Sequence, residues 1–210
     1  MRQSQGGATT PCPLEQAGGF PCRGFGRKVG VKSPSRQGNL HRVMSPLDSQ
    51  KPYHVRAGTL EDLASVHALI VELAVYEKAP NEVSLSLDQL MHDAAEGCFC
   101  WTVAVLEDST IIGVALHHAK YSTWKGKTWH LEDLVVTEKW RGLGVGKALF
   151  SAVVETANGQ GAQRLEWQVL DWNEPAIGFY KKLEAALSSE WLNGRLTKAQ
   201  LDSYPTQSTF

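Results

Sequence analysis

The strongest constraint on the fold is a glycine-rich turn between a strand-like segment and a helix-like one. Five apolar or acidic residues, 132–136, precede the turn Arg141-Gly142-Leu143-Gly144-Val145-Gly146-Lys147. Glycines let backbone N–H groups approach an anion closely, and the start of a helix adds partial positive charge. The segment therefore predicts a strand–turn–helix unit that binds a diphosphate, with Arg141 and Lys147 adding charge at its rim.

Two other phosphate motifs fail on spacing. A dinucleotide fingerprint needs G-x-G-x-x-G, and from Gly142 its last glycine position holds Lys147. A P-loop needs an earlier glycine where Arg141 stands, and a Ser or Thr where Ala148 stands. The turn is therefore neither a dinucleotide fingerprint nor a P-loop.

Hydrophobic periodicity predicts the elements around this turn. Strands are expected over 53–57, 99–106, 111–119, 129–136, 164–170 and 191–196, and helices after a Thr59 cap and over 87–95, 144–157 and 175–186. This order predicts an α/β fold with a mixed sheet and helices on both faces. Adjacent strand residues alternate in direction, so Glu132 and Asp133 are expected to face opposite ways.

The chain divides by composition into a tail and a domain. Residues 1–43 are rich in Gly, Ser, Gln, Pro and Arg and show no hydrophobic period, which predicts a disordered basic tail. Its Arg-rich, acid-poor composition is also typical of an organelle transit peptide. A translation start at Met44 would instead make it an extension of the gene model. The folded domain is expected over residues 52–205.

Composition excludes several classes of partner. No apolar run approaches the roughly 20 residues that span a bilayer. Residues 1–43 contain seven Lys or Arg and one acidic residue, so the rest of the chain carries a net negative charge. This charge disfavours nucleic acid as a partner. Cys98 and Cys100 share a strand face, but no ligand-spaced cluster completes a metal site. We expect a cytoplasmic protein with no metal, no membrane and no nucleic-acid partner.

The turn and four further stretches resemble the GCN5-related N-acetyltransferase (GNAT) superfamily. Its acyl-CoA motif, Gln/Arg-x-x-Gly-x-Gly/Ala, is matched by Arg141 to Gly146. The closest resemblance is to the diamine and thialysine N-epsilon-acetyltransferase branch, through residues 72–78, 121–126, 131–133 and 171–181. It covers about residues 53–201. It implies the GNAT fold with a mostly antiparallel sheet, acetyl-CoA as cosubstrate and a homodimer.

The resemblance also implies a role for each matching residue. The cofactor set comprises Leu134, Val135 and Val136 for the pantetheine arm, Arg141, Gly142, Leu143, Gly144, Val145, Gly146 and Lys147 for the diphosphate, and Asn173 and Tyr180 for the rest of CoA. Tyr180 would be the general acid and Glu132 the base, acting through water. The substrate set comprises Glu132, Asp133, Tyr76, Glu77, Tyr121, Ser122, Thr123 and Trp124. Polyamine enzymes carry an acid where Ser122 stands, which points away from polyamines.

One position departs from the family pattern. Glycine is usual after the tyrosine helix, where this chain has Glu184. A left-handed conformation there costs roughly 1 kcal/mol, unless the helix continues for another turn. For His117, His118 and His130 a structural or solvated role is predicted rather than catalysis.

These observations predict an enzyme that transfers acetyl from acetyl-CoA to the primary amine of a small molecule. The amine would be thialysine- or lysine-like, or a diamine, and would attack directly in a ternary complex. Two alternatives remain open. One is acetylation of proteins or peptides, and the other is a non-catalytic module that binds acyl-CoA.

Overall fold

The computed structural model describes residues 51–205, so the predicted tail, 1–43, lies outside the described residues. The chain divides into two compact units between Trp167 and Gln168. The first carries a five-stranded sheet in the order β1-β2-β3-β4-β5. Its strands are β1 (Tyr53–Ala57), β2 (Cys100–Leu106), β3 (Ile111–Ser122), β4 (Gly126–Val136) and β5 (Leu165–Glu166). Neighbours are antiparallel except β4 and β5, which are parallel.

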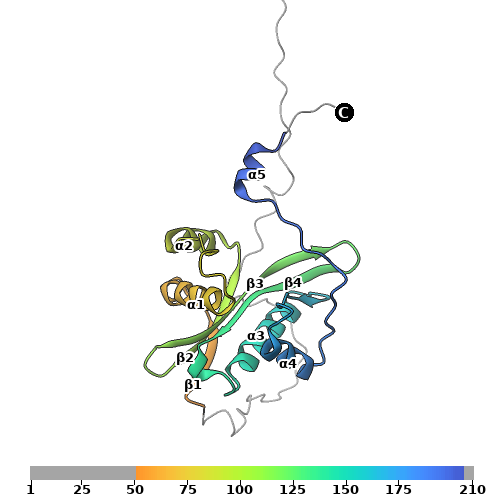
Figure 1. Ribbon diagram of the computed structural model, residues 1–210. Helices are drawn as coiled ribbons and strands as arrows, with labels where there is room; N and C mark the ends of the chain where they lie inside the picture. The colour runs from red at the N-terminus through yellow and green to blue at the C-terminus, as the bar shows by residue number, and fades with distance from the viewer. Residues whose placement is uncertain (1–50, 206–210) are drawn as a thin grey trace, which may run out of the picture. The chain divides into compact units, whose positions relative to one another are not determined.

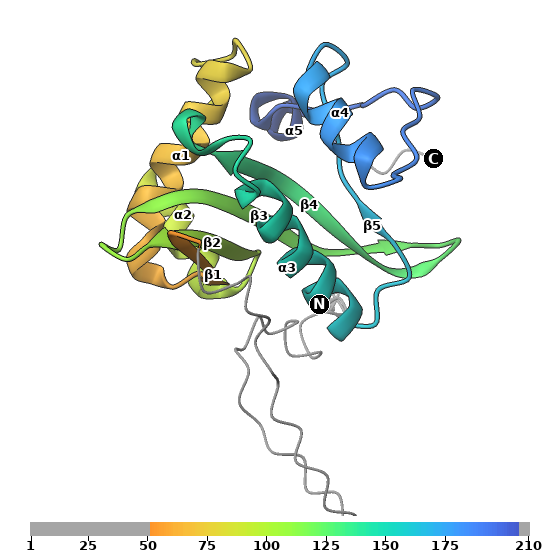
Figure 2. The same cartoon turned by 90° about the horizontal axis from the view of Figure 1, so that it is seen from below.

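Helices cover both faces of this sheet (Figures 1 and 2). α1 (Leu63–Tyr76) and α2 (Leu87–Glu96) pack on one face, against a core that includes Val103, Val114 and Val135. α3 (Val145–Gly159) lies on the other face, where Leu149 approaches Gly113. The predicted α/β class, with a mixed and mostly antiparallel sheet between helices, is confirmed. Within residues 51–205, no helix has the length and apolarity needed to cross a bilayer.

The connection from β1 to α1 is held by one charged pair. The Arg56 guanidinium donates to both carboxylate oxygens of the buried Asp62, at 2.6 and 2.8 Å. Asp62 ends a short 3-10 helix (η3, Leu60–Asp62) and also accepts from the Thr59 N–H. These bonds hold the pKa of Asp62 below its ordinary value, with the Arg56 hydrogen bond the largest cause. The predicted cap at Thr59 is confirmed.

The second unit contains α4 (Glu174–Lys182) and α5 (Lys198–Ser203). Pro175 lies in the first turn of α4, as predicted, and the Asn173 side chain caps it by accepting from the Ala176 N–H. Two predictions are wrong here: α4 does not reach residue 186, and residues 191–196 form no strand. A strand needs a neighbour to satisfy its backbone groups, and described residues 168–205 contain no other strand.

The chain turns sharply after α4 at Glu184, whose φ is +58°. The left-handed conformation expected at this position is therefore confirmed, and continuation of the helix is wrong. A side chain in that conformation crowds its own backbone, whereas glycine does not.

We predict that Glu184→Gly raises the free energy of unfolding by about 1 kcal/mol, because it removes this crowding. Urea titration followed by circular dichroism would measure the change. Ala185→Gly is the control, since its φ is not positive and the substitution should give no gain. A loss of stability in Glu184→Gly would contradict the prediction.

Candidate active site

One edge of β4 is open. β4 pairs with β3 along its length, from Val136 opposite Gly113 to Gly126 opposite Ser122. It pairs with β5 only at Trp129 and His130. Among the described residues, no strand covers the other edge over 131–136. Backbone N–H and C=O groups there can hydrogen-bond an extended amide arm as if it were another strand. The predicted pantetheine residues Leu134, Val135 and Val136 lie on this edge.

The glycine turn follows a short 3-10 helix (η4, Glu138–Trp140) and opens α3. Gly142 and Gly144 have φ of +77° and +84°, conformations that favour glycine. The first helical bond of α3 runs from the Ala148 N–H to the Gly144 oxygen, at 3.0 Å. The N–H groups of residues 145–147 precede it, so no helical carbonyl accepts from them. The turn therefore presents donors at a helix start, as an anion site requires.

Gly146 differs from the other two glycines. Its φ is not positive, and an added Cβ would lie 3.8 Å from a methyl group of Val136, an ordinary contact. The backbone therefore does not require glycine at this position, in keeping with the Gly/Ala choice of the family motif.

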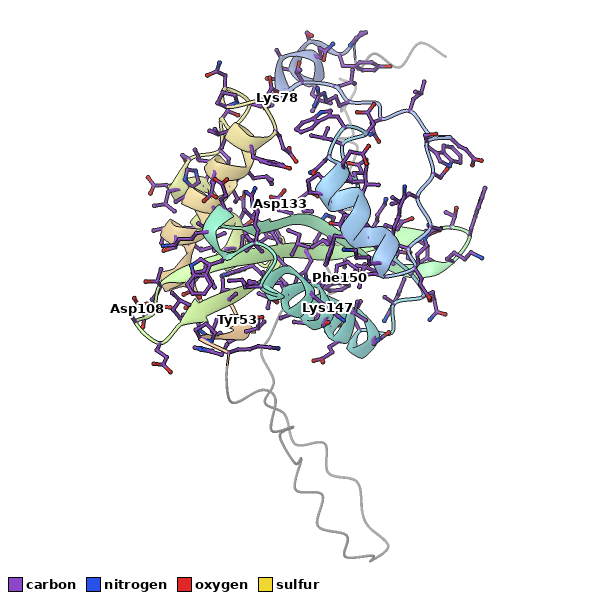
Figure 3. All side chains as sticks on the ribbon, turned by 60° about the horizontal axis from the view of Figure 1, so that its bottom comes forward. Tyr53, Lys78, Asp108, Asp133, Lys147 and Phe150 are labelled. Atoms are coloured by element: carbon purple, nitrogen blue, oxygen red, sulfur yellow. The ribbon has the colours of Figure 1, made fainter. Side chains whose placement is uncertain are left out.

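Arg141 ties the turn to α1. Its Nε donates to the Val136 carbonyl oxygen at 2.8 Å. Its guanidinium lies 4.8 Å from the centre of the Tyr76 ring and 3.9 Å from a carboxylate oxygen of Glu72. The end of β4, the turn and the end of α1 are thereby held together. Figure 3 marks Lys147, which follows the turn on α3.

Tyr53 is a residue that sequence reasoning missed. Its buried hydroxyl has no hydrogen-bond partner among the described residues. It lies 3.6 Å from the position that a Cβ on Gly144 would take. Nothing in the first strand's alternating pattern distinguishes this tyrosine, because only the fold brings β1 beneath the turn.

β4 carries a β-bulge at Glu132. Leu116 pairs with Asp133 and His117 with Leu131, so Glu132 is an extra residue with no partner on β3. Such a residue breaks the regular alternation of side chains. The register therefore changes which β4 residues share a face.

The bulge places both carboxylates on the α1 side of the sheet. Leu116 follows the core residue Val114 by two positions, so its partner Asp133 faces the α1 side. His118 shares that side, and its Nε2 lies 3.4 Å from the Glu132 carboxylate. The expectation that Glu132 and Asp133 face opposite ways is therefore wrong, because the bulge interrupts the period of two.

Three carboxylates gather at this end of β4 and α1. Burial raises the pKa of Asp133 to about 6, and the charges of Glu132 and Glu77 add to the effect. Burial also raises the pKa of Glu77. Glu132 is the more open, with 55% of its side chain exposed. A site of this charge favours a cationic ligand such as an ammonium group. Figure 3 labels Asp133 on β4.

Four predicted substrate residues lie elsewhere in this unit. Tyr121, Ser122, Thr123 and Trp124 form the tip of the β3–β4 hairpin, where the Ser122 hydroxyl accepts from the N–H groups of Trp124 and Lys125. Asp133 is seven residues along β4 from Gly126, or about 20 Å at the usual rise of a strand. Within one chain the structure therefore brings Glu77 near Asp133 and Tyr76 against Arg141, but it does not bring the hairpin tip to the carboxylates.

The three histidines separate into two environments. His117 is buried on the α3 side, where its Nδ1 accepts from the Trp129 indole at 2.9 Å. Burial lowers the pKa of His117 to about 4, so the imidazole stays neutral and structural, as predicted. His118 and His130 instead flank Glu132, each within 3.5 Å of its carboxylate. Burial is also the main cause that lowers the pKa of His130.

Tyr180 belongs to the second unit. It lies on α4 beside Phe179, with ring centroids 5.1 Å apart. Its side chain is buried, and burial raises the pKa of its phenol to about 12. Near neutral pH the group therefore carries its proton, which is the state that a general acid needs.

An open strand edge, followed by a glycine turn at a helix start and accompanied by a cluster of carboxylates, suits a transferase that uses an acyl-CoA thioester. The profile of the Acetyltransferase (GNAT) family matches residues 63–184, and the chain belongs to this family. The predicted family and the predicted class of enzyme, an N-acetyltransferase, are thereby confirmed.

The names of similar proteins indicate which branch of the family this chain resembles. Thialysine N-epsilon-acetyltransferase of Bos taurus is 35% identical over 140 residues, which are 62% of this chain and 82% of the relative. L-ornithine N5-acetyltransferase NATA1 of Arabidopsis thaliana is 38% identical over 93 residues, which are 44% of this chain and 41% of that protein. Among solved structures, an aminoglycoside acetyltransferase from an uncultured soil metagenomic sample has a TM-score of 0.60 at 19% identity. That alignment covers 70% of this chain and 96% of the other, and it supports the fold alone.

We predict that Asp133→Asn stabilises the protein at pH 7 by about 1–3 kcal/mol, because one pKa unit corresponds to about 1.4 kcal/mol. The pKa of Asp133 rises from its ordinary 3.8 to about 6 on folding, so the folded state holds the proton more tightly. The wild type should therefore lose stability relative to the variant as pH rises from about 4 to about 6.

Urea titrations of both proteins across this range would measure the difference. Glu107→Gln, on the exposed turn between β2 and β3, is the control and should show no such divergence. Parallel curves for the wild type and Asp133→Asn would contradict the prediction.

Proposed function

We propose that this protein transfers acetyl from acetyl-CoA to the primary amine of a small molecule, thialysine- or lysine-like or a diamine, in a ternary complex. The observation that carries the proposal is the pair of carboxylates, Glu132 and Asp133, on one side of an open strand edge that leads into the glycine turn. The relatives whose names specify thialysine and ornithine support an amine of this class.

The donor would lie along β4 and the turn. The exposed edge from Leu134 to Val136 would pair with the two amides of pantetheine, and residues 141–147 would take the diphosphate on backbone N–H groups. Arg141 and Lys147 would add positive charge at the rim, and the unpartnered Tyr53 hydroxyl beneath Gly144 supplies one more donor. Asn173 would contact the CoA arm, as the family resemblance implies.

Acetyl transfer to an amine needs a base, an oxyanion donor and an acid. Lysine-like amines are almost wholly protonated near pH 7, so Glu132 would remove a proton through water, while Asp133 and Glu77 hold the ammonium. A strand N–H near Leu134 would polarise the acetyl carbonyl. The amine nitrogen bonds to the carbonyl carbon, the carbon–sulfur bond breaks, and Tyr180 returns a proton to the departing thiolate.

The proposal also covers the oligomeric state of the protein. Tyr121 and Trp124 expose 72% and 81% of their surface at the hairpin tip, which supports contact with a second molecule. We therefore extend the proposal to a homodimer, whose size light scattering would measure, and the expected location of the protein remains the cytoplasm. No metal, nucleic acid or membrane takes part in the proposed reaction.

Gly144→Ala should weaken CoA binding at least about tenfold and cost about 1 kcal/mol of stability, because a methyl group at φ +84° strains the turn. Gly146→Ala is the matched control and should keep both CoA affinity and stability, since space exists for its Cβ. Isothermal titration with CoA measures the first effect and urea unfolding the second. Equal affinity in the two variants would remove the turn from the proposed binding site.

An amine panel with acetyl-CoA, followed by release of free thiol, tests the whole proposal. We expect turnover with thialysine, lysine or diamines, and silence across the panel would contradict it. Activity on peptides alone would favour the protein-acetylating alternative. CoA binding without turnover would favour the non-catalytic one.

Two substitutions separate the roles of the chemical groups. Tyr180→Phe and Glu132→Gln should each lower kcat by about 100-fold, the lower range for a general acid or base, with little change in CoA affinity. Steady-state kinetics measure this. An unchanged kcat in either variant would remove that residue from its assigned role, and a larger loss in Asp133→Asn than in Glu132→Gln would reassign the base.

A further inference from the structure

β3 and β4 bring together three side chains, of which the proposed reaction uses only Glu132, as its base. His118 and His130 stand directly opposite each other, with ring centroids 5.1 Å apart. Glu132, the bulged residue, follows His130 by two positions. One nitrogen from each histidine and one carboxylate oxygen of Glu132 all lie within 4.8 Å of one another. We propose that His118, His130 and Glu132 bind a divalent transition-metal cation of the zinc type.

The spacing of the ligand atoms fits such an ion. His118 Nε2 and His130 Nε2 lie 3.4 and 3.5 Å from the same oxygen of Glu132. Zinc binds histidine nitrogen at about 2.0–2.1 Å and carboxylate oxygen at about 2.0–2.2 Å, which in a tetrahedron separates neighbouring ligands by about 3.4 Å. Two of the three separations therefore already match the bound geometry.

The hydrogen bond on the far side of His118 supports the same conclusion. His118 Nδ1 lies 3.0 Å from the carbonyl oxygen of Ala119, which can only accept, so Nδ1 carries the hydrogen. In the neutral imidazole, Nε2 then points a lone pair at the Glu132 carboxylate, which is also an acceptor. Either a proton on Nε2 or a cation shared with Glu132 removes this conflict. A second ring nitrogen that donates to a backbone carbonyl is also the usual support of a metal-bound histidine.

The residues around the three side chains leave a cation access to them. The nearby positive charge of Lys120 is paired with an acid. The side chains of His118 and Glu132 are 33% and 55% exposed, so a cation can enter and keep a coordinated water. Lys120, on the same side of β3, is paired with Glu166 at 3.1 Å, and Arg164 pairs with that carboxylate at 2.5 Å. Lys120, the basic side chain that acts on His130, is therefore partnered by an acid.

Imidazole and carboxylate ligands favour zinc and its neighbours over magnesium, which prefers oxygen ligands alone. The sequence predicted no metal site because it shows no cluster of His and Cys with ligand spacing, and His118 and His130 are twelve residues apart. Strand pairing joins the two histidines, and the bulge turns Glu132 toward them.

The test is a titration of the full-length protein with Zn²⁺, monitored by competition with a chromophoric chelator, with excess Mg²⁺ present. We expect one ion per chain. Loss of an outer-shell partner alone costs about 10–100-fold in affinity, so His118→Ala, His130→Ala and Glu132→Gln should each weaken binding at least about tenfold. Circular dichroism verifies that each variant is folded, and Glu132→Gln changes an exposed carboxylate that folding does not require.

The matched control is His92→Ala. His92 forms a similar histidine–carboxylate pair with Glu96 on α2, at 3.5 Å, but without a third ligand, so its loss should leave zinc affinity unchanged. The visible spectrum of the Co²⁺ form reports the ligand types independently. Bands of a nitrogen and oxygen site, lost in Glu132→Gln, support the proposal.

Three results would overturn it: no zinc binding in the wild type, equal affinity in Glu132→Gln, or a thiolate-to-cobalt band. None of these readouts measures acetyl transfer, so the outcome is separate from that of the amine panel.

Discussion

The candidate site depends on incomplete pairing of one strand. β4 pairs with β3 along its length except at the bulged Glu132, which fixes its position, yet it shares only two residue pairs with β5. β4 is thus an interior strand of the sheet where it pairs with β5, and an edge strand over residues 131–136. A strand backbone whose N–H and C=O groups are not paired by β5 is what an extended amide ligand needs, and the glycine turn follows this edge after η4.

The bulge at Glu132 organises the polar part of the site. It adds one residue to β4 without a counterpart on β3, so two successive carboxylates face the α1 side. Burial and the charges of Glu132 and Glu77 then raise the pKa of Asp133 to about 6. Repulsion between these carboxylates raises the free energy of the site, so binding of a cation there is favourable. The cation can be the ammonium group of a substrate or a metal ion.

Local backbone chemistry was predictable from the sequence. Gly142 and Gly144 lie in the predicted turn before a helix, Thr59 and Asn173 cap helices, and Glu184 takes the conformation usually given to glycine. Features that depend on the pairing of strands were not predictable from the sequence. The bulge follows from the register of β3 against β4, which an assumed period of two cannot reveal. Residues 191–196 form no strand although their composition favours one, and described residues 168–205 offer no strand for them to pair with. The roles of Tyr180 and Asn173 come from the resemblance and remain proposals.

An unpaired strand edge is also a template for pairing with another protein chain. Edges of this kind promote aggregation unless charged side chains interrupt them. Glu132 and Asp133 place two acids on the uncovered stretch of β4, so two such edges in register would bring like charges together. The residues best placed to act on an amine therefore also discourage self-association along this edge whenever no ligand covers it.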